Sequence, residues 1–150
     1  MKNILIVTVC VLIGLAVVTG CQKSASTTNY SMDAIIAGKP TIFNNCFVSA
    51  GYNSITGSAS NYVIEGLSNS SNFPYIMLSV PAIKDTTYYI SGTTVSNYAK
   101  YFVDTVTTKY AASGIVVIAS VSPYVIGSYS FTCTDGTTIT QGTFIAKPLN

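Results

Sequence analysis

Turn-forming residues recur at short intervals from residue 32 to the end of the chain, and this spacing leaves no room for long helices. The runs between the turns are rich in Thr, Tyr, Val and Ile, which fit a pleated, half-buried sheet better than a helix. Gly, Asn and Pro separate these runs. About eight to ten short strands divided in this way are typical of an all-β domain. We expect a single antiparallel β-sandwich or small barrel.

The strand pattern is clear in most places and ambiguous in one. Strands are expected at 32–36, 41–50, 54–59, 62–67, 75–80, 86–91, 114–121, 124–134 and 137–146. In segment 95–110 a helix would group Tyr98, Tyr101, Phe102 and Thr105, whereas a strand would group Tyr98, Phe102 and Val106. The β-branched residues of 103–108 favour strands with a bend at Asp104.

One hairpin is expected at Asp135-Gly136, which lies between two alternating runs. Such a dipeptide indicates a two-residue type I′ turn. That turn would pair Cys133 with Thr138.

The first twenty-one residues predict export. Lys2 supplies a positive charge, residues 4–18 are apolar, and Val18-Thr19-Gly20 leads into Cys21. The apolar run is short for a membrane-spanning helix, which needs about 20 apolar residues. A charged start, a short apolar middle and a small-residue exit describe a cleaved secretory signal over residues 1–20. A retained membrane anchor and a signal without lipid remain alternatives.

The exit sequence resembles the lipobox of bacterial lipoproteins. This resemblance implies that Cys21 is acylated, with palmitate among the acyl chains, and becomes the new N-terminus. Two or three acyl chains hold a protein firmly on a bilayer, whereas one does not. We therefore expect a lipidated tether at 21–31, which is polar and lacks apolar periodicity, followed by one domain at 32–150.

Composition excludes several classes of function. Only 8% of residues are charged, and clustered basic residues of the kind that bind nucleic acid are absent. The chain has no His, which excludes a Ser-His-Asp triad and His-based zinc sites. Nothing in the spacing brings two of the five acids together for acid–base chemistry, and the acids are Asp33, Glu65, Asp85, Asp104 and Asp135. We expect no enzymatic activity, metal or cofactor.

Two further cysteines and the tyrosines are the remaining candidates for a structural or binding role. In an exported protein Cys46 and Cys133 predict one disulfide, and the alternative is a pair of reduced thiols in the core. The chain has eleven tyrosines, of which Tyr88, Tyr89, Tyr98 and Tyr101 are candidates for stacking on sugars or for a protein-binding patch. Tyrosines that fill the core and its rim are the alternative.

Several segments resemble a family of small secreted lipoproteins of Bacteroidota with unassigned function. The resemblance covers most of the mature chain and rests on residues 32–39, 114–118, 127–131, 135–136 and 142–144. It departs at Thr41, where that family usually has a tryptophan. The resemblance implies an outer-membrane lipoprotein.

Two more features resemble those of exported Bacteroidota proteins. Asp85-Thr86-Thr87 and Asp104-Thr105-Val106 resemble O-glycosylation sites, with Thr86 and Thr105 as acceptors. Gln22-Lys23 resembles the start of a surface-export signal, but Ser24 and Ala25 follow where acids are usual, so the periplasmic and surface faces both remain open.

Together these patterns predict a lipid-anchored protein of the cell envelope that acts as a non-enzymatic binding module for a glycan or a protein. Its expected partners are the membrane, through the lipid on Cys21, and a glycan or another envelope protein. The alternative is a structural or assembly subunit that pairs through strand edges.

Overall fold

The fold is all-β, as the sequence predicts. The computed structural model describes residues 29–52, 59–68, 73–92 and 97–148. This part of the chain forms a ten-stranded antiparallel sheet and contains no helix. Its strands are β1 (Ser31–Ile36), β2 (Lys39–Phe43), β3 (Asn45–Tyr52), β4 (Ala59–Leu67), β5 (Tyr75–Val80), β6 (Thr86–Ser91), β7 (Tyr98–Phe102), β8 (Thr108–Ser120), β9 (Val125–Cys133) and β10 (Thr138–Ala146).

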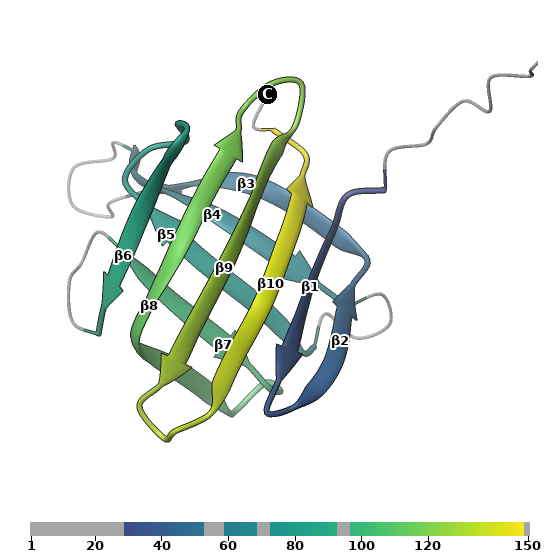
Figure 1. Ribbon diagram of the computed structural model, residues 1–150, viewed down its shortest axis with the longest axis vertical. Helices are drawn as coiled ribbons and strands as arrows, with labels where there is room; N and C mark the ends of the chain where they lie inside the picture. Colours follow the sequence, from purple (N-terminus) through teal and green to yellow (C-terminus); the bar gives the residue numbers. More distant parts are fainter. Residues whose placement is uncertain (1–28, 53–58, 69–72, 93–96, 149–150) are drawn as a thin grey trace, which may run out of the picture.

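The sheet folds over itself into a nearly closed barrel (Figure 1). One layer contains β6, β8, β9, β10, β1 and β2, and the other contains β3, β4, β5 and β7. The end of β10 meets β3, where the Val48 amide donates to the Lys147 carbonyl at 2.9 Å. The Lys147 amide in turn donates to the Cys46 carbonyl at 3.0 Å. These bonds join the two layers along one side of the barrel.

The chain passes from one layer to the other at points where the inward-facing side of a strand changes. In β8 the side chain of Ala111 is buried, and further along the strand those of Val116 and Ile118 are buried. The inward-facing positions therefore change from odd-numbered to even-numbered residues, so the alternation shifts by one residue. A register irregularity lies between Ala111 and Ser113, where β8 leaves β7 and begins to pair with β6. A bulge bends a strand in this way and changes the side-chain direction.

A second shift lies between β2 and β3. Phe43 and Cys46 are both buried, and the two asparagines between them are exposed. This is why the single strand expected at 41–50 is wrong: the chain bends at Asn44 and continues in the other layer as a separate strand.

Inward-facing side chains of both layers fill the barrel. The largest fully buried ones are Phe43, Phe144, Met32, Ile64, Ile76, Leu78, Ile118 and Ile139. Burial of a side chain of this size stabilises the fold by about 1.5–3 kcal/mol.

The barrel has two ends. The upper end in Figure 1 holds the start of β1 and the end of β10, and the lower end holds the β1–β2 and β9–β10 turns. The first described residues lie at the upper end, where the Tyr30 ring packs edge-on against Tyr124 at 5.8 Å between centroids.

The described part of segment 95–110, residues 97–110, contains β7 and the start of β8, as its β-branched residues favour. β7 and β8 are joined by a tight connection in which Asp104 Oδ1 accepts hydrogen bonds from the amides of Val106 and Thr107, at 2.8 and 2.7 Å. Of the strand expected at 54–59, only Ala59 lies within the described residues, in β4. The strand expected at 114–121 begins earlier than predicted, at Thr108.

The type I′ turn expected at Asp135-Gly136 is wrong. A type I′ turn requires positive φ at both central residues. Here Gly136 has a φ of 84°, but Asp135 does not have a positive φ. The Cys133 amide donates to the Thr137 carbonyl, and the Gly136 amide donates to the Cys133 carbonyl, which closes a three-residue loop. The extra residue shifts the register by one, so Thr138 pairs with Thr132 rather than with Cys133.

A substitution at Gly127 tests the packing of β9 against its neighbours β8 and β10. A Cβ at this position of β9 would overlap the backbone oxygen of Val117 and the ring of Phe144. We expect Gly127→Ala to lower the free energy of unfolding by roughly 1–3 kcal/mol, the usual cost of overpacking. Urea unfolding followed by circular dichroism measures the change, with Ser128→Ala at the adjacent exposed position as control. Equal stability of the two variants would contradict this packing.

Candidate functional site

The four candidate tyrosines do not form one cluster. Tyr88 is buried in the core, and its hydroxyl donates to the Ala82 carbonyl at 2.8 Å. Tyr89 points the opposite way and is 72% exposed on β6. Tyr98 lies half-buried on the outer face of β7, whereas Tyr101, three residues further on, faces the lower end of the barrel. Only Tyr101 lines a cavity with other polar groups.

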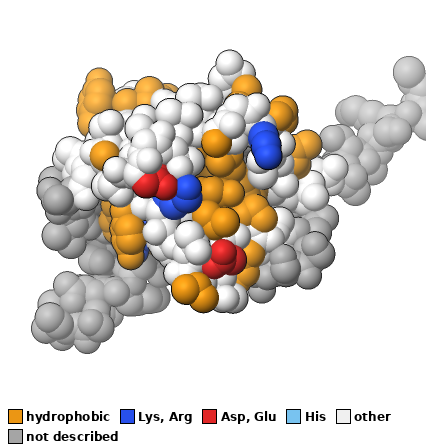
Figure 2. Space-filling view, turned by 90° about the horizontal axis from the view of Figure 1, so that it is seen from below, with side chains coloured by type: hydrophobic (Ala, Val, Ile, Leu, Met, Phe, Trp, Pro, Cys, Tyr) orange, Lys and Arg blue, Asp and Glu red, His pale blue; other side chains and the backbone are white. Residues whose placement is uncertain are grey.

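This lower cavity has a volume of about 470 Å³ and lies between the β1–β2 turn, the β7–β8 connection and the β9–β10 turn. Its apolar lining comes from Ile36, Ala37 and Val103. Its polar lining comes from Lys39, Tyr101, Thr107, Lys109 and Thr137. Figure 2 looks onto this end, where apolar side chains gather at the centre and charged ones lie around them.

The best-defined polar contact at this end is an ion pair between β8 and the β9–β10 turn. Lys109 Nζ lies 2.8 Å from Asp135 Oδ2 and donates to Thr137 Oγ1 at 2.7 Å. The Thr137 amide donates to Asp135 Oδ1 at 3.0 Å. The lysine and this amide hold the pKa of Asp135 down to about 2, and the same contact raises the pKa of Lys109. Both groups are charged at neutral pH, and their positions are fixed by the turn.

Tyr101 adds an aromatic ring with a neutral hydroxyl to this cavity. Burial raises the pKa of its phenol, so the group remains a hydrogen-bond donor at neutral pH. The sequence identified Tyr101 but missed Lys39, Lys109 and Thr137. The available signal was the Asp135-Gly136 turn, which places Asp135 at the end of a hairpin. Lys109 lies in segment 95–110, which the sequence left open between helix and strand, so its pairing opposite Tyr101 and its contact with Asp135 were not predicted.

A second group of aromatic residues lies on the outer face of β5, β7 and β8. The Tyr75 and Phe102 rings stack at 4.0 Å and 11°. Lys100 Nζ lies 5.0 Å from the Tyr98 ring centroid and 5.2 Å from that of Tyr110. These rings already cover one another or a lysine, and none of them lines the lower cavity.

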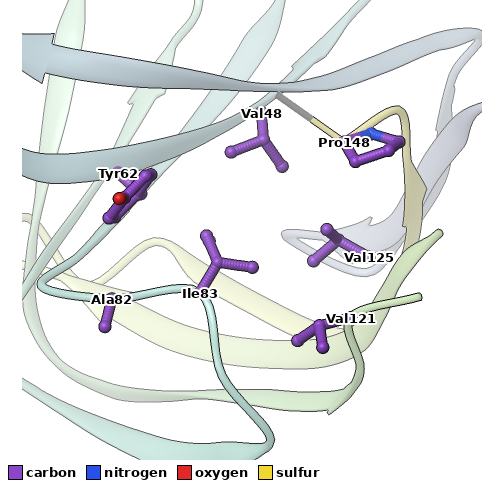
Figure 3. A pocket seen from close by; sticks show the side chains of 7 residues that line it. All are labelled: Val48, Tyr62, Ala82, Ile83, Val121, Val125 and Pro148. Atoms are coloured by element: carbon purple, nitrogen blue, oxygen red, sulfur yellow. The ribbon is translucent and has the colours of Figure 1, made fainter. Parts of the chain in front are cut away.

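A third feature is an apolar cavity at the upper end, also of about 470 Å³. Figure 3 shows the side chains of Val48, Ile83, Val121 and Val125 pointing into a common space, with Tyr62, Ala82 and Pro148 at its margins. None of these lining residues is charged. The two cavities therefore lie at opposite ends of the barrel and have different lining chemistry.

The disulfide expected between Cys46 and Cys133 is not present, and both residues are buried free thiols. Cys46 lies beside Lys147 at the end of β10, whereas Cys133 lies at the other end of the β9–β10 hairpin. The length of β10 separates these points by roughly 25 Å at 3.3 Å per residue. A disulfide needs Cα atoms within about 7 Å. Burial raises the pKa of Cys46 to about 12 and that of Cys133 to about 11, so both thiols are protonated at neutral pH.

The remaining predicted sites are dispersed. Cys21 lies outside the described residues, Thr86 is half-buried at the start of β6, and Thr105 is exposed in the β7–β8 connection. The five acids stand on five different strands or connections. In residues 29–148, apart from the gaps, no group of three or more metal-ligating side chains occurs.

Protonation of Asp135 gives a test of the ion pair. Because the folded-state pKa of about 2 lies below the ordinary 3.8, the stabilisation is fully present above pH 3.8 and is lost as the pH falls towards 2. We expect Asp135→Asn to be less stable than wild type near neutral pH, with the difference shrinking below the ordinary pKa. Urea unfolding across this range measures the effect, and Asp85→Asn, on an exposed loop, is the charge-matched control. A difference that is independent of pH would contradict the pair.

Comparisons with known proteins add no assignment to this geometry. No protein-family model, characterised protein or solved structure matches the chain. Within the described ranges, the structure also has no helix with the length and apolar composition that a bilayer crossing requires.

Proposed function

We propose that this protein is a lipid-anchored binding module of the cell envelope and that its lower cavity binds a glycan. The observation that supports this most is the convergence of an aromatic ring, hydroxyl groups, lysines and a carboxylate at one concave end of a rigid barrel. Binding sites for small polar ligands combine an apolar surface with a few positioned polar groups in this way.

The lining suits a neutral, hydroxyl-rich ligand better than a charged one. Asp135 already balances the charge of Lys109, and Lys39 adds one positive charge at the rim. The site therefore offers both donors and acceptors with little net charge. Sugars present hydroxyl groups together with apolar C–H faces, and the Tyr101 ring supplies a flat apolar surface with a polar tip.

The position of the cavity agrees with an anchored module. Tyr30, the second described residue, lies at the upper end beside Tyr124, and the lower cavity opens at the opposite end. An N-terminal lipid would leave the lower end directed away from the membrane surface. A ligand in the surrounding space would then reach the cavity without displacing lipid.

The strand edge of β6 supports the alternative, an assembly subunit. In an antiparallel pair, alternate residues of a strand bond to the partner strand. The Gly92 amide donates to the Ala112 carbonyl, so the even-numbered residues of β6 bond to β8. The odd-numbered residues of β6 direct their backbone N–H and C=O groups away from β8. The Tyr89 carbonyl accepts from Asn97 Nδ2 at 3.2 Å, which covers part of this edge. The edge is therefore shorter than the strand, and the glycan site remains the better-supported proposal.

The anchor is tested on Cys21. We expect the mature protein to begin at this residue with acyl chains attached, because the small residues before it form the cleavage site. Mass spectrometry of the N-terminal peptide from native membranes measures the modification. Cys21→Ser is expected to abolish it, and an unmodified, uncleaved N-terminus in the wild-type protein would refute the anchor.

The glycan site is tested with two variants of the full chain. We expect Tyr101→Ala and Lys109→Ala to weaken binding to any glycan that the wild type selects on a glycan array. Loss of a ring or of a charge-assisted hydrogen bond costs about 1.5–3 kcal/mol, or roughly tenfold to a hundredfold in affinity. Tyr89→Ala removes an exposed tyrosine that does not line the cavity, and this variant is expected to bind as wild type.

The control separates this proposal from the alternative. Equal loss in Tyr89→Ala would exclude the lower cavity as the site. A protein that selects no glycan and forms oligomers whose assembly depends on β6 would support the assembly subunit instead.

A further inference from the structure

The upper cavity lies at the end of the barrel where the N-terminal part of the chain joins it. Val125 lines the cavity, and its neighbour Tyr124 packs edge-on against Tyr30 at 5.8 Å and 71°. Residues that precede Tyr30 are therefore attached next to the cavity rim.

The chemistry of the cavity matches a hydrocarbon chain. Its lining is Val48, Ile83, Val121, Val125 and Pro148 with the smaller Ala82, and the Tyr62 ring closes one side (Figure 3). The volume of about 470 Å³ falls within the range of about 300–1,000 Å³ that is usual for ligand sites. Val121 is 41% exposed, so the cavity is open to a ligand from outside.

We propose that this cavity holds one acyl chain of the lipid on Cys21 of the same molecule. This proposal rests on the lipidation proposed above. Cys21 precedes Tyr30 by 30 − 21 = 9 residues, which can span at most about 30 Å when extended. The lipid can therefore reach the rim without any change in the barrel.

The tether favours the protein's own lipid over a separate one. A ligand linked by a short segment binds at an effective concentration in the millimolar range, independent of free lipid. In a bilayer the acyl chain is already removed from water, so moving it into the cavity lowers its free energy little. Away from a bilayer the cavity shields one chain that would otherwise be exposed to water. Occupancy is thus coupled to release from the membrane.

The test compares two forms of the native protein. The lipidated protein is divided, and one half is treated with a lipase, which removes the ester-linked acyl chains, and with an amidase, which removes an amide-linked one. Both halves are then titrated with a fluorescent fatty acid in detergent-free solution, after circular dichroism has verified that both remain folded. We expect the deacylated form to bind the probe and the lipidated form to bind it at least roughly tenfold more weakly, because its cavity is occupied.

Matched variants locate the probe. Val121→Trp adds an indole to the cavity, and Ile126→Trp adds the same bulk on the outer face of the next strand. The two wild-type side chains are similarly exposed, at 41% and 37%, so neither substitution overpacks the core. In the deacylated protein we expect Val121→Trp to bind the probe at least roughly tenfold more weakly, and Ile126→Trp to bind as wild type.

The outcomes distinguish this proposal from the anchor on which it rests. An unmodified Cys21 in mass spectra would refute both. An acylated Cys21 with no probe binding by the deacylated form, or with equal binding by Val121→Trp, would overturn the cavity assignment and leave the anchor intact. Equal binding by the lipidated and deacylated forms would also overturn it, because the cavity would then take a separate lipid.

Discussion

The barrel can close because β8 and the β2–β3 segment change the side that they turn inward. At Ala112 the bulge lets the first part of β8 pair with β7 and the rest with β6 and β9. At Asn44 the chain bends from one layer into the other. Without these two shifts, one face of the sheet would remain exposed to water, and the apolar side chains of β5 and β10 would have no common interior. Both end cavities lie beyond the region that these side chains fill.

The closed sheet separates two kinds of surface. The lower end brings together side chains from β2, β7, β8 and the β9–β10 turn, and Lys109 of β8 pairs there with Asp135 of the turn. The upper end brings together aliphatic side chains, and the first described residues pack beside it. Some lining residues, such as Ile36, Tyr62 and Tyr101, lie on strands that pair on both sides, whereas others, such as Ile83, Val103 and Thr137, lie in the connections between strands.

Local patterns predicted the strands well and their long-range arrangement poorly. Alternation of apolar and polar residues gave the positions of β1, β5, β6 and β9, since each presents one face to the interior. The same rule failed at Asn44 and Ala112, because a one-residue shift in alternation is a response to tertiary packing. Tyr101 was identified as a candidate. Lys109 pairs with it directly between the consecutive strands β7 and β8, in a segment that the sequence left open between helix and strand, and Thr137 reaches the cavity from the distant β9–β10 turn. Asp135-Gly136 marked the hairpin correctly, whereas the loop contains one residue more than the dipeptide suggests.

The absence of a bridge between Cys46 and Cys133 has a consequence for how this domain is made. Its fold relies on interior packing and on no covalent link between these two residues. Folding of the described barrel therefore does not depend on oxidation of these two thiols. Chemical damage would act differently: oxidation of either sulfur would introduce a polar group into hydrocarbon surroundings and loosen the barrel from within.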